Sequence, residues 1–242
     1  AFCAALLNAQ PMGFYSPHTL VQDARRHGVE TRTPDVNASD WCATLEPCDR
    51  SEGGLAVRLG LSYVRHVGDD LAKVIAAGRP YSSIEDVARR SGASGQALEA
   101  LATAGAFACF DVIASDADFD ADFDAGPPAT AGPPATAGPL KAPVHQCVGG
   151  FEGPGKHGSE VGVGDGGAGG SRRAALWTAG AATQAGADRL EGIVVGTHAP
   201  TLPGMEPVEE AMADLWATGV APDGHPTRFL RDHLDGMGVV TS

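Results

Sequence analysis

The sequence has no long hydrophobic run. None of its 242 residues lies in a stretch that approaches the roughly 18 consecutive apolar residues of a membrane helix. The first residues, AFCAALLNAQPMG, lack both an initiator methionine and the basic start of a signal peptide, so we expect neither a leader nor a natural beginning there. The sequence therefore predicts a soluble, cytoplasmic chain with no membrane partner.

Cysteine and aromatic residues are scarce. The five cysteines include no CxxC pair, which argues against a disulfide framework and against a zinc ribbon. None has histidine or acidic neighbours at ligand spacing, so we interpret all of them as incidental and expect no metal site. Phe, Trp and Tyr together make up 6% of the chain.

Positive charge is also in the minority. The chain has 17 Lys and Arg and 30 Asp and Glu, which gives a formal net charge of −13. Taken alone, this charge argues against a nucleic-acid partner. The charge is uneven, however: residues 111–170 contribute −7, whereas residues 1–110 and 171–242 contribute −2 and −4. A role in DNA handling is therefore not excluded for the two flanking segments.

Residues 111–170 are repetitive and rich in Gly and Pro. They contain DADFDADFDA at 116–125, then AGPPAT twice, then a glycine-rich run. Such a composition buries too little apolar surface to offset the entropy of ordering, so we predict a long disordered acidic and Gly/Pro insert. Carboxylates two residues apart in DADF could share a divalent ion, but a tandem repeat without a rigid scaffold favours low complexity instead.

The flanks predict a mainly α-helical fold. Ser16 as an N-cap and Pro17 at the first helical position predict a helix over 17–27, and residues 2–9 predict another. Residues 34–41 are typical of turn and loop.

The C-terminal flank predicts a further small helical region. His225-Pro226-Thr227 is typical of a helix start, with Pro226 at the first position. Trp177 and Trp216 lie among Leu and Ala at helical spacing, so we expect both in the core rather than as base-stacking platforms.

A short strand over 55–61 is followed by three short helices joined by tight turns. The first helix is predicted at 69–77, the second is capped by Ser83 and stopped by Gly92, and the third is capped by Ser94. This run is typical of a tandem helix-hairpin-helix unit, and a plain small helical bundle is the alternative.

A helix-hairpin-helix turn binds a phosphate oxygen through backbone N–H groups at the start of its second helix, so it positions a duplex without reading bases. The usual turn has two glycines around an aliphatic residue. Here His66 takes the first position, where the backbone must adopt left-handed angles. Asp69 and Asp70 would repel phosphate, and nearby cations would compensate. We predict that the DNA-backbone-binding residues are Arg65, His66, Val67, Gly68 and Lys73.

Several long blocks in the right order resemble one protein family. The blocks AALLNAQPMGFYSPHTLVQDARRHGVE at 4–30, PDVNAS at 34–39 and AVRLGLSYVRHVGDDLAKVIAAGRPYSSIEDVARRSGASGQALEALATAGAF at 56–107 closely resemble the bacterial C-family replicative polymerases, the DNA polymerase III alpha subunits. The tail, SRRAALWTAG at 171–180 and LPGMEPVEEAMADLWATGVAPDGHPTRFLRDHL at 202–234, is similar to the error-prone, damage-tolerant branch of that family.

The resemblance implies a domain organisation. Residues 1–54 would be the end of the fingers domain, 55–110 the tandem helix-hairpin-helix domain, 111–170 an insert without counterpart in the family pattern, and 171–242 a helical region leading to an absent OB-fold. It also implies a segment of a DNA-directed DNA polymerase, a nucleotidyltransferase, that serves damage-induced mutagenesis and translesion synthesis. This part would position nucleotide and template and grip the duplex backbone.

The resemblance also places four side chains near the nucleotide and template: Asn8, Gln10, Tyr15 and Arg25. The residues themselves leave local alternatives open. Asn8 and Gln10 could satisfy nearby backbone groups, Tyr15 could pack, and Arg25 with Arg26 could form a solvated helix face.

The family's catalytic carboxylates lie in the palm, upstream of the fingers. We therefore expect no catalytic residue, metal or cofactor in this segment and no polymerase activity from it alone, with Mg²⁺ implied only for the full polymerase. The implied partners are duplex DNA or primer-template and, through the full-length enzyme, a sliding clamp and mutagenesis accessory proteins. Two alternatives stay open: a stand-alone duplex-binding module, and the inert product of an interrupted gene in which 108–170 is a frame artefact.

Overall fold

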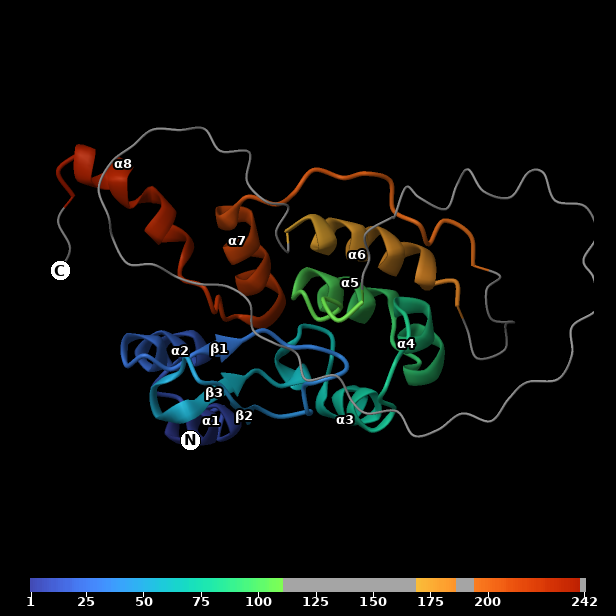
Figure 1. The fold of residues 1–242 in the computed structure, drawn as a ribbon, viewed down its shortest axis with the longest axis horizontal. Coiled ribbons are helices and arrows are strands. Elements are labelled where there is room, and N and C mark those ends of the chain that lie inside the picture. The colour runs from blue at the N-terminus through green and yellow to red at the C-terminus, as the bar shows by residue number, and fades with distance from the viewer. Residues whose placement is uncertain (111–168, 186–193, 240–242) are drawn as a thin grey trace, which may run out of the picture. The chain divides into compact units, whose positions relative to one another are not determined.

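The fold is mainly helical, as the sequence predicts, with one small sheet (Figure 1). A computed structural model describes residues 1–110, 169–185 and 194–239, all within one structural unit. The predicted insert lies outside the described residues except for its last two, which belong to a helix. The α-helices are α1 (Phe2–Asn8), α2 (Pro17–Arg26), α3 (Asp69–Ala77), α4 (Ile84–Ser91), α5 (Gly95–Thr103), α6 (Gly169–Ala182), α7 (Pro207–Thr218) and α8 (Arg231–Gly236).

Serine N-caps fix where three of these helices begin. The side-chain oxygens of Ser16, Ser83 and Ser94 each accept the backbone N–H three residues later, at 3.1–3.2 Å. Gly92 ends α4 in the left-handed region, at a φ of 66°. These starts and this stop confirm the predicted helices, because capping depends on residues close together in the sequence.

The sheet has three strands in the order β1-β3-β2, namely β1 (Thr31–Arg32), β2 (Thr44–Pro47) and β3 (Leu55–Arg58). The central strand β3 pairs parallel with β1 and antiparallel with β2. The strand predicted over 55–61 is therefore shorter than expected, since residues Leu61–Tyr63 form the 3-10 helix η2. The outer strands escape sequence analysis because their pairing is not local.

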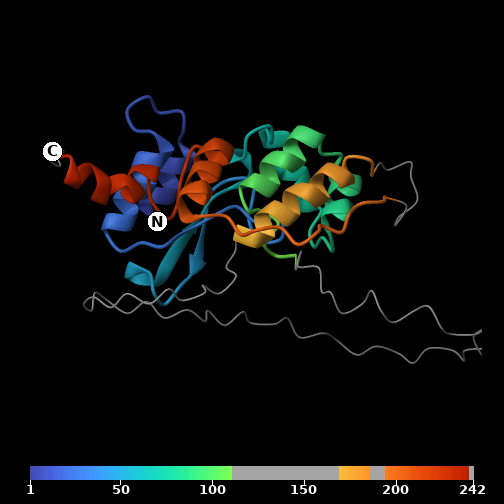
Figure 2. The same cartoon turned by 90° about the horizontal axis from the view of Figure 1, so that it is seen from above.

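Two hydrophobic clusters hold the described residues together. The larger lies around α5, with Leu98, Leu101 and Phe107 almost fully buried, and α5 runs beside α6 in both views (Figures 1 and 2). The smaller joins α1 and α2 to the sheet and includes Val220. Residues from the C-terminal flank contribute to both clusters, so the two flanks fold as one unit.

Trp177 and Trp216 are not core residues, and the prediction that they are was wrong. Their exposed fractions are 51% and 43%. The helices that carry them bury small residues instead, namely Ala174, Ala175, Ala179, Ala182, Ala211 and Ala217. Alanine faces allow close helix packing and turn the indoles outward.

Two further 3-10 helices complete the described structure: η1 (Glu52–Gly54) and η3 (Pro226–Leu230). The latter confirms the helix start predicted at 225–227. Pro226 takes its first position, and the ring of His225 accepts the N–H of Thr227 at 3.3 Å. The helix turns α-helical only from Arg231.

Candidate nucleic-acid interface

The predicted phosphate-binding turn connects η2 to α3. Its residue His66 has a φ of 62° and is the one non-glycine residue with positive φ in the described part of the chain. Val67 is 2% exposed, and its N–H donates to the carbonyl of Val64 at 3.0 Å. The turn is therefore fixed by its own packing and hydrogen bonding, and neither the side chain nor the N–H of Val67 is available to a ligand.

Gly68 forms the N-cap of α3. Its φ of −70° and ψ of 171° are open to any residue, no side chain caps the helix, and a Cβ built on it would meet no atom within 4 Å. Neither backbone geometry nor internal packing requires glycine here. The first N–H groups of a helix have no partner within it, and here they lie at the positive end of the helix dipole, next to the open space around Gly68. The arrangement suits an oxygen anion that approaches from outside.

A second turn with the same backbone geometry connects α4 to α5. Gly92, at a φ of 66°, corresponds to His66, and Ser94, at φ −67° and ψ 160°, corresponds to Gly68. The helix that follows is nine residues long in both cases. The structure thus contains two hairpins, as expected for a tandem unit.

The second turn is closed to an external ligand at the point where the first is open. The hydroxyl of Ser94 already accepts the N–H of Ala97. A Cβ on Gly95 would lie 3.0 Å from the methyl carbon of Thr183, the residue that follows α6, so the C-terminal end of α6 covers this helix start.

The first turn is supported by α7. The N–H of Arg65 donates to the carbonyl of Ala217 at 2.7 Å, and its guanidinium lies 5.1 Å from the ring centroid of Trp216. The backbone N–H of Arg65 is therefore occupied, and its exposed side chain is what remains for DNA.

Lys73 lies one turn into α3 and is exposed. Its ammonium is 4.9 Å from the ring centroid of Trp41, a cation–π arrangement. Asp69 and Asp70 are exposed in the first turn of the same helix. Two cations and two carboxylates thus flank the turn, so the net charge there does not by itself attract DNA.

The residues expected near the nucleotide lie elsewhere. The side-chain amide of Asn8 donates to the carbonyl of Ala43 at 2.9 Å and its oxygen accepts the N–H of Ala43 at 2.8 Å. Gln10 donates to the carbonyl of Tyr15 at 3.1 Å, and the Tyr15 side chain is exposed. Within the described residues, no hydrogen bond, ion pair or ring contact connects these residues or Arg25 with the first turn.

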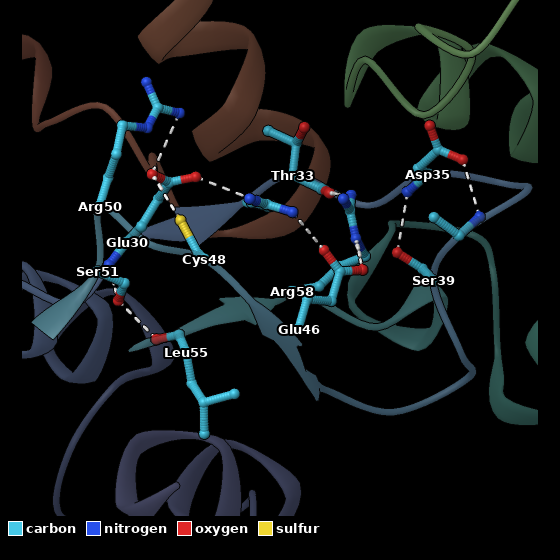
Figure 3. A network of polar contacts seen from close by, with 12 residues as sticks. Glu30, Thr33, Asp35, Ser39, Glu46, Cys48, Arg50, Ser51, Leu55 and Arg58 are labelled. Carbon is cyan, nitrogen blue, oxygen red and sulfur yellow. Dashed lines mark hydrogen bonds and ion pairs between the residues drawn. The ribbon is translucent and has the colours of Figure 1, made fainter. Parts of the chain in front are cut away.

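The arginines of the sheet are paired internally (Figure 3). Arg32 lies between Glu30 and Glu46 at 3.1 and 2.7 Å, and Arg58 also pairs with Glu46. Burial by itself raises the pKa of Glu46, but hydrogen bonds from Arg58 and Arg32 outweigh it and hold that pKa below its ordinary value. Arg50 pairs with Glu30 at 3.3 Å. These arginines are neutralised by glutamates within the fold, so they contribute little positive charge for binding DNA.

A buried ion pair connects α6 and α7, the helices that lie against the second and the first turn. Arg172 of α6 contacts Asp214 of α7 at 2.8 Å, and both are at most 9% exposed. A Cβ on Gly105 would lie 3.0 Å from Nε of Arg172, so the pair also touches the chain just after α5. Burial raises the pKa of Asp214 to about 6, although Arg172 opposes the shift. No sequence signal joins residues so far apart.

Within the part of the chain that the structure describes, no three His, Cys, Asp or Glu side chains are grouped so that they could hold a metal ion. No helix there is long and apolar enough to cross a membrane.

Comparison with known proteins finds relatives that are similar to the chain along almost its whole length. Residues 28–119 match the helix-hairpin-helix motif. Over 99% of its length, the chain is 45% identical to the error-prone DNA polymerase of Mycolicibacterium paratuberculosis and 43% identical to that of Nocardia farcinica. The chain is homologous to one segment of the error-prone DNA polymerases. It spans only 17% and 16% of the length of these two relatives.

Another relative matches a shorter part of the chain. Over 109 residues, 44% of its length, the chain is 52% identical to error-prone DNA polymerase 2 of Rhizobium meliloti and covers 10% of that protein. The family resemblance read from the sequence is confirmed, and the helix-hairpin-helix match supports DNA binding. The domain boundaries at 54, 110 and 170 stay predictions.

Proposed function

We propose that this chain is the duplex-holding segment of an error-prone DNA polymerase. The observation that carries the proposal is the open start of α3 at Gly68, in a chain that is 45% identical to such polymerases. A phosphate oxygen would take the position that the Ser94 hydroxyl takes in the second turn. The contact would hold the DNA backbone without reading the sequence of bases.

The mixed charges near the open turn would make DNA binding weak and confined to a few phosphates. Arg65 and Lys73 would approach phosphates on either side of the turn, and Asp69 with Asp70 would limit the attraction. Only about two to four phosphates would be neutralised, so the logarithm of the association constant should fall with the logarithm of the salt concentration with a slope of about −2 to −4.

Finer roles follow from the family and are part of the same proposal. Asn8, Gln10, Tyr15 and Arg25 would border the nucleotide and template, with the two amides acting through the backbone segments that they fix. The complete enzyme would work in the cytoplasm in translesion synthesis, with a sliding clamp and mutagenesis accessory proteins. The segment alone would not extend a primer, because two-metal phosphoryl transfer needs clustered carboxylates and the described residues present none.

Duplex binding by the 242-residue chain tests the proposal. Fluorescence anisotropy with a short labelled DNA duplex, titrated between about 50 and 200 mM salt, should give measurable binding with the shallow slope above. Undetectable or salt-independent binding would reject it and favour the inert gene product. A primer-extension assay with Mg²⁺ and deoxynucleotides should show no product, and extension would refute the claim that the segment is non-catalytic.

A further inference from the structure

A concentration of positive charge lies where α2 meets the C-terminal η3–α8 segment. A pocket of about 580 Å³ opens there, and none of its lining residues is acidic. We call it the arginine pocket; it is lined by Gln22, Arg25, Arg26, Gly224, His225, Thr227, Arg228, Arg231 and Leu234.

Two of these arginines differ from the rest in the described part of the chain. The side chains of Arg25 and Arg26 make no hydrogen bond, ion pair or ring contact with any described residue, whereas the sheet arginines Arg32 and Arg58 are both paired. The other two are partly satisfied: Arg228 donates to the carbonyl of Asp223 at 3.3 Å, and Arg231 pairs with Asp235 across one helix turn. The pocket therefore holds unneutralised positive charge.

The guanidinium groups converge from distant parts of the chain. A Cβ built on Gly224 would lie 3.7 Å from Nη1 of Arg25 and 3.7 Å from Nη1 of Arg228. Gly224 is buried with a φ of 128°, a conformation that L side chains rarely adopt. The backbone at Gly224 therefore leaves room for the Arg25 and Arg228 side chains to approach each other. Like charges so close repel one another unless an anion lies between them.

We infer that the arginine pocket binds phosphate groups. Planar guanidinium groups donate paired hydrogen bonds that match phosphate oxygens, and several of them around one anion offset their mutual repulsion. The pocket shares no residue with the Gly68 turn, so this is a second phosphate site on the same segment. The phosphates belong to a nucleic-acid strand or to a nucleoside triphosphate, which present the same chemistry.

Single-stranded DNA is the probe that separates this pocket from the duplex-holding turn. The full chain is titrated into fluorescein-labelled oligothymidylate, and binding is followed by anisotropy. Arg25→Ala and Arg26→Ala should each weaken binding about threefold to tenfold and make the salt slope shallower by about 1. Arg50→Ala is the matched control, because it removes the same charge from an exposed arginine outside the pocket, and it should leave the affinity within about twofold.

Competition identifies the source of the phosphate. If unlabelled dATP at equal phosphate concentration displaces the probe, the site takes nucleotides; if only unlabelled oligothymidylate displaces it, the site takes a strand. The inference is overturned if the wild-type chain does not bind the probe, or if both pocket variants bind it as Arg50→Ala does. Thermal unfolding confirms that the variants are folded, which we expect because both positions lie in a helix where alanine is favourable.

The pocket and the Gly68 turn can fail separately. Gly68→Asp should weaken duplex binding and leave oligothymidylate binding unchanged. If Gly68→Asp binds duplex DNA as the wild type does while Arg25→Ala still binds oligothymidylate more weakly, the proposed duplex-holding function is wrong and the arginine pocket stands.

Discussion

The two hairpin turns share one backbone conformation and differ in what lies in front of them. In the first, His66 precedes an uncapped Gly68 that faces open space. In the second, Gly92 precedes Ser94, whose hydroxyl caps its own helix beneath α6. The same local geometry thus gives one helix start that faces outward and another that faces the protein. Duplication of a motif does not duplicate its binding surface.

The open turn depends on the closed one. The helix that covers the second turn is joined by Arg172–Asp214 to α7, and α7 accepts the N–H of Arg65 in the first turn. The second hairpin therefore contributes as a structural base for the first. Substitutions at the first turn should therefore change duplex affinity, and substitutions in the structural base should change the free energy of unfolding.

The largest effect should come from the shared support, through the titration of Asp214. Burial raises its folded pKa to about 6 from an ordinary value of 3.8. A raised pKa means that the folded state binds the proton more tightly, so this contribution is present below pH 3.8 and is lost as the pH rises through about 6. The difference of about two pKa units corresponds to about 3 kcal/mol at most.

Asp214→Asn is the reference for this titration, since an amide has the same shape and does not ionise. Denaturant unfolding at several pH values should show the wild-type chain losing stability relative to Asp214→Asn between about pH 4 and pH 7. If the two proteins run parallel across that range, the carboxyl group has an ordinary pKa, and the ion pair with Arg172 fully offsets its burial.

The sharpest test of the comparison places the same residue at both N-caps. Gly68→Asp should lower duplex affinity at least about tenfold, roughly 1.4 kcal/mol, because the carboxylate takes the N–H groups and repels phosphate. Ser94→Asp replaces one good N-cap by another at a covered site, so affinity should stay within about twofold. Anisotropy with a DNA duplex measures both.

Both aspartate variants should keep the melting temperature of the wild type within a few degrees, which excludes unfolding as the cause. Equal losses of duplex affinity at the two sites would contradict the division of roles. Loss only in Ser94→Asp would mean that the covered turn is the one that reaches DNA.

A smaller effect is expected when the positive-φ residues are exchanged. His66→Gly removes a side chain from a left-handed position and should raise the free energy of unfolding by about 1 kcal/mol, whereas Gly92→His should lower it by about 1 kcal/mol. Chemical denaturation of the two single variants gives both values. A fall in stability in His66→Gly would show that the imidazole makes a stabilising contact that outweighs the strain.

The parts of this structure that could be predicted from the sequence are those set by neighbours. Serine caps, glycine stops and the left-handed demand at His66 each involve residues within a few positions, and each was found. The strands β1 and β2 were missed because their hydrogen bonds reach β3 from elsewhere in the chain. The outward Trp216 was missed because alanine packing, not side-chain hydrophobicity, decides which face of α7 is buried.

The candidate sites divide in the same way. The Gly68 turn could be located from its spacing, but its openness is known only from the structure, in which a Cβ on Gly68 would meet no atom within 4 Å. The arginine pocket had no sequence signal beyond the Arg25-Arg26 pair. Arg228 approaches this pair from about two hundred residues further along the chain, through the conformation of Gly224.

The smallest effect should come from the indole beneath Arg65. Trp216→Leu removes the cation–π contact, which at this half-exposed site should cost about 0.5 kcal/mol of unfolding free energy, and Trp216→Phe should recover part of it. Duplex affinity should change less than about twofold, since the Arg65 N–H still donates to the Ala217 carbonyl and the turn keeps its place. Denaturant unfolding and duplex anisotropy on the same two variants provide the test. A tenfold loss of affinity in Trp216→Leu that Trp216→Phe restores would instead make this ring a platform for DNA bases, and would extend the open surface of the first turn onto α7.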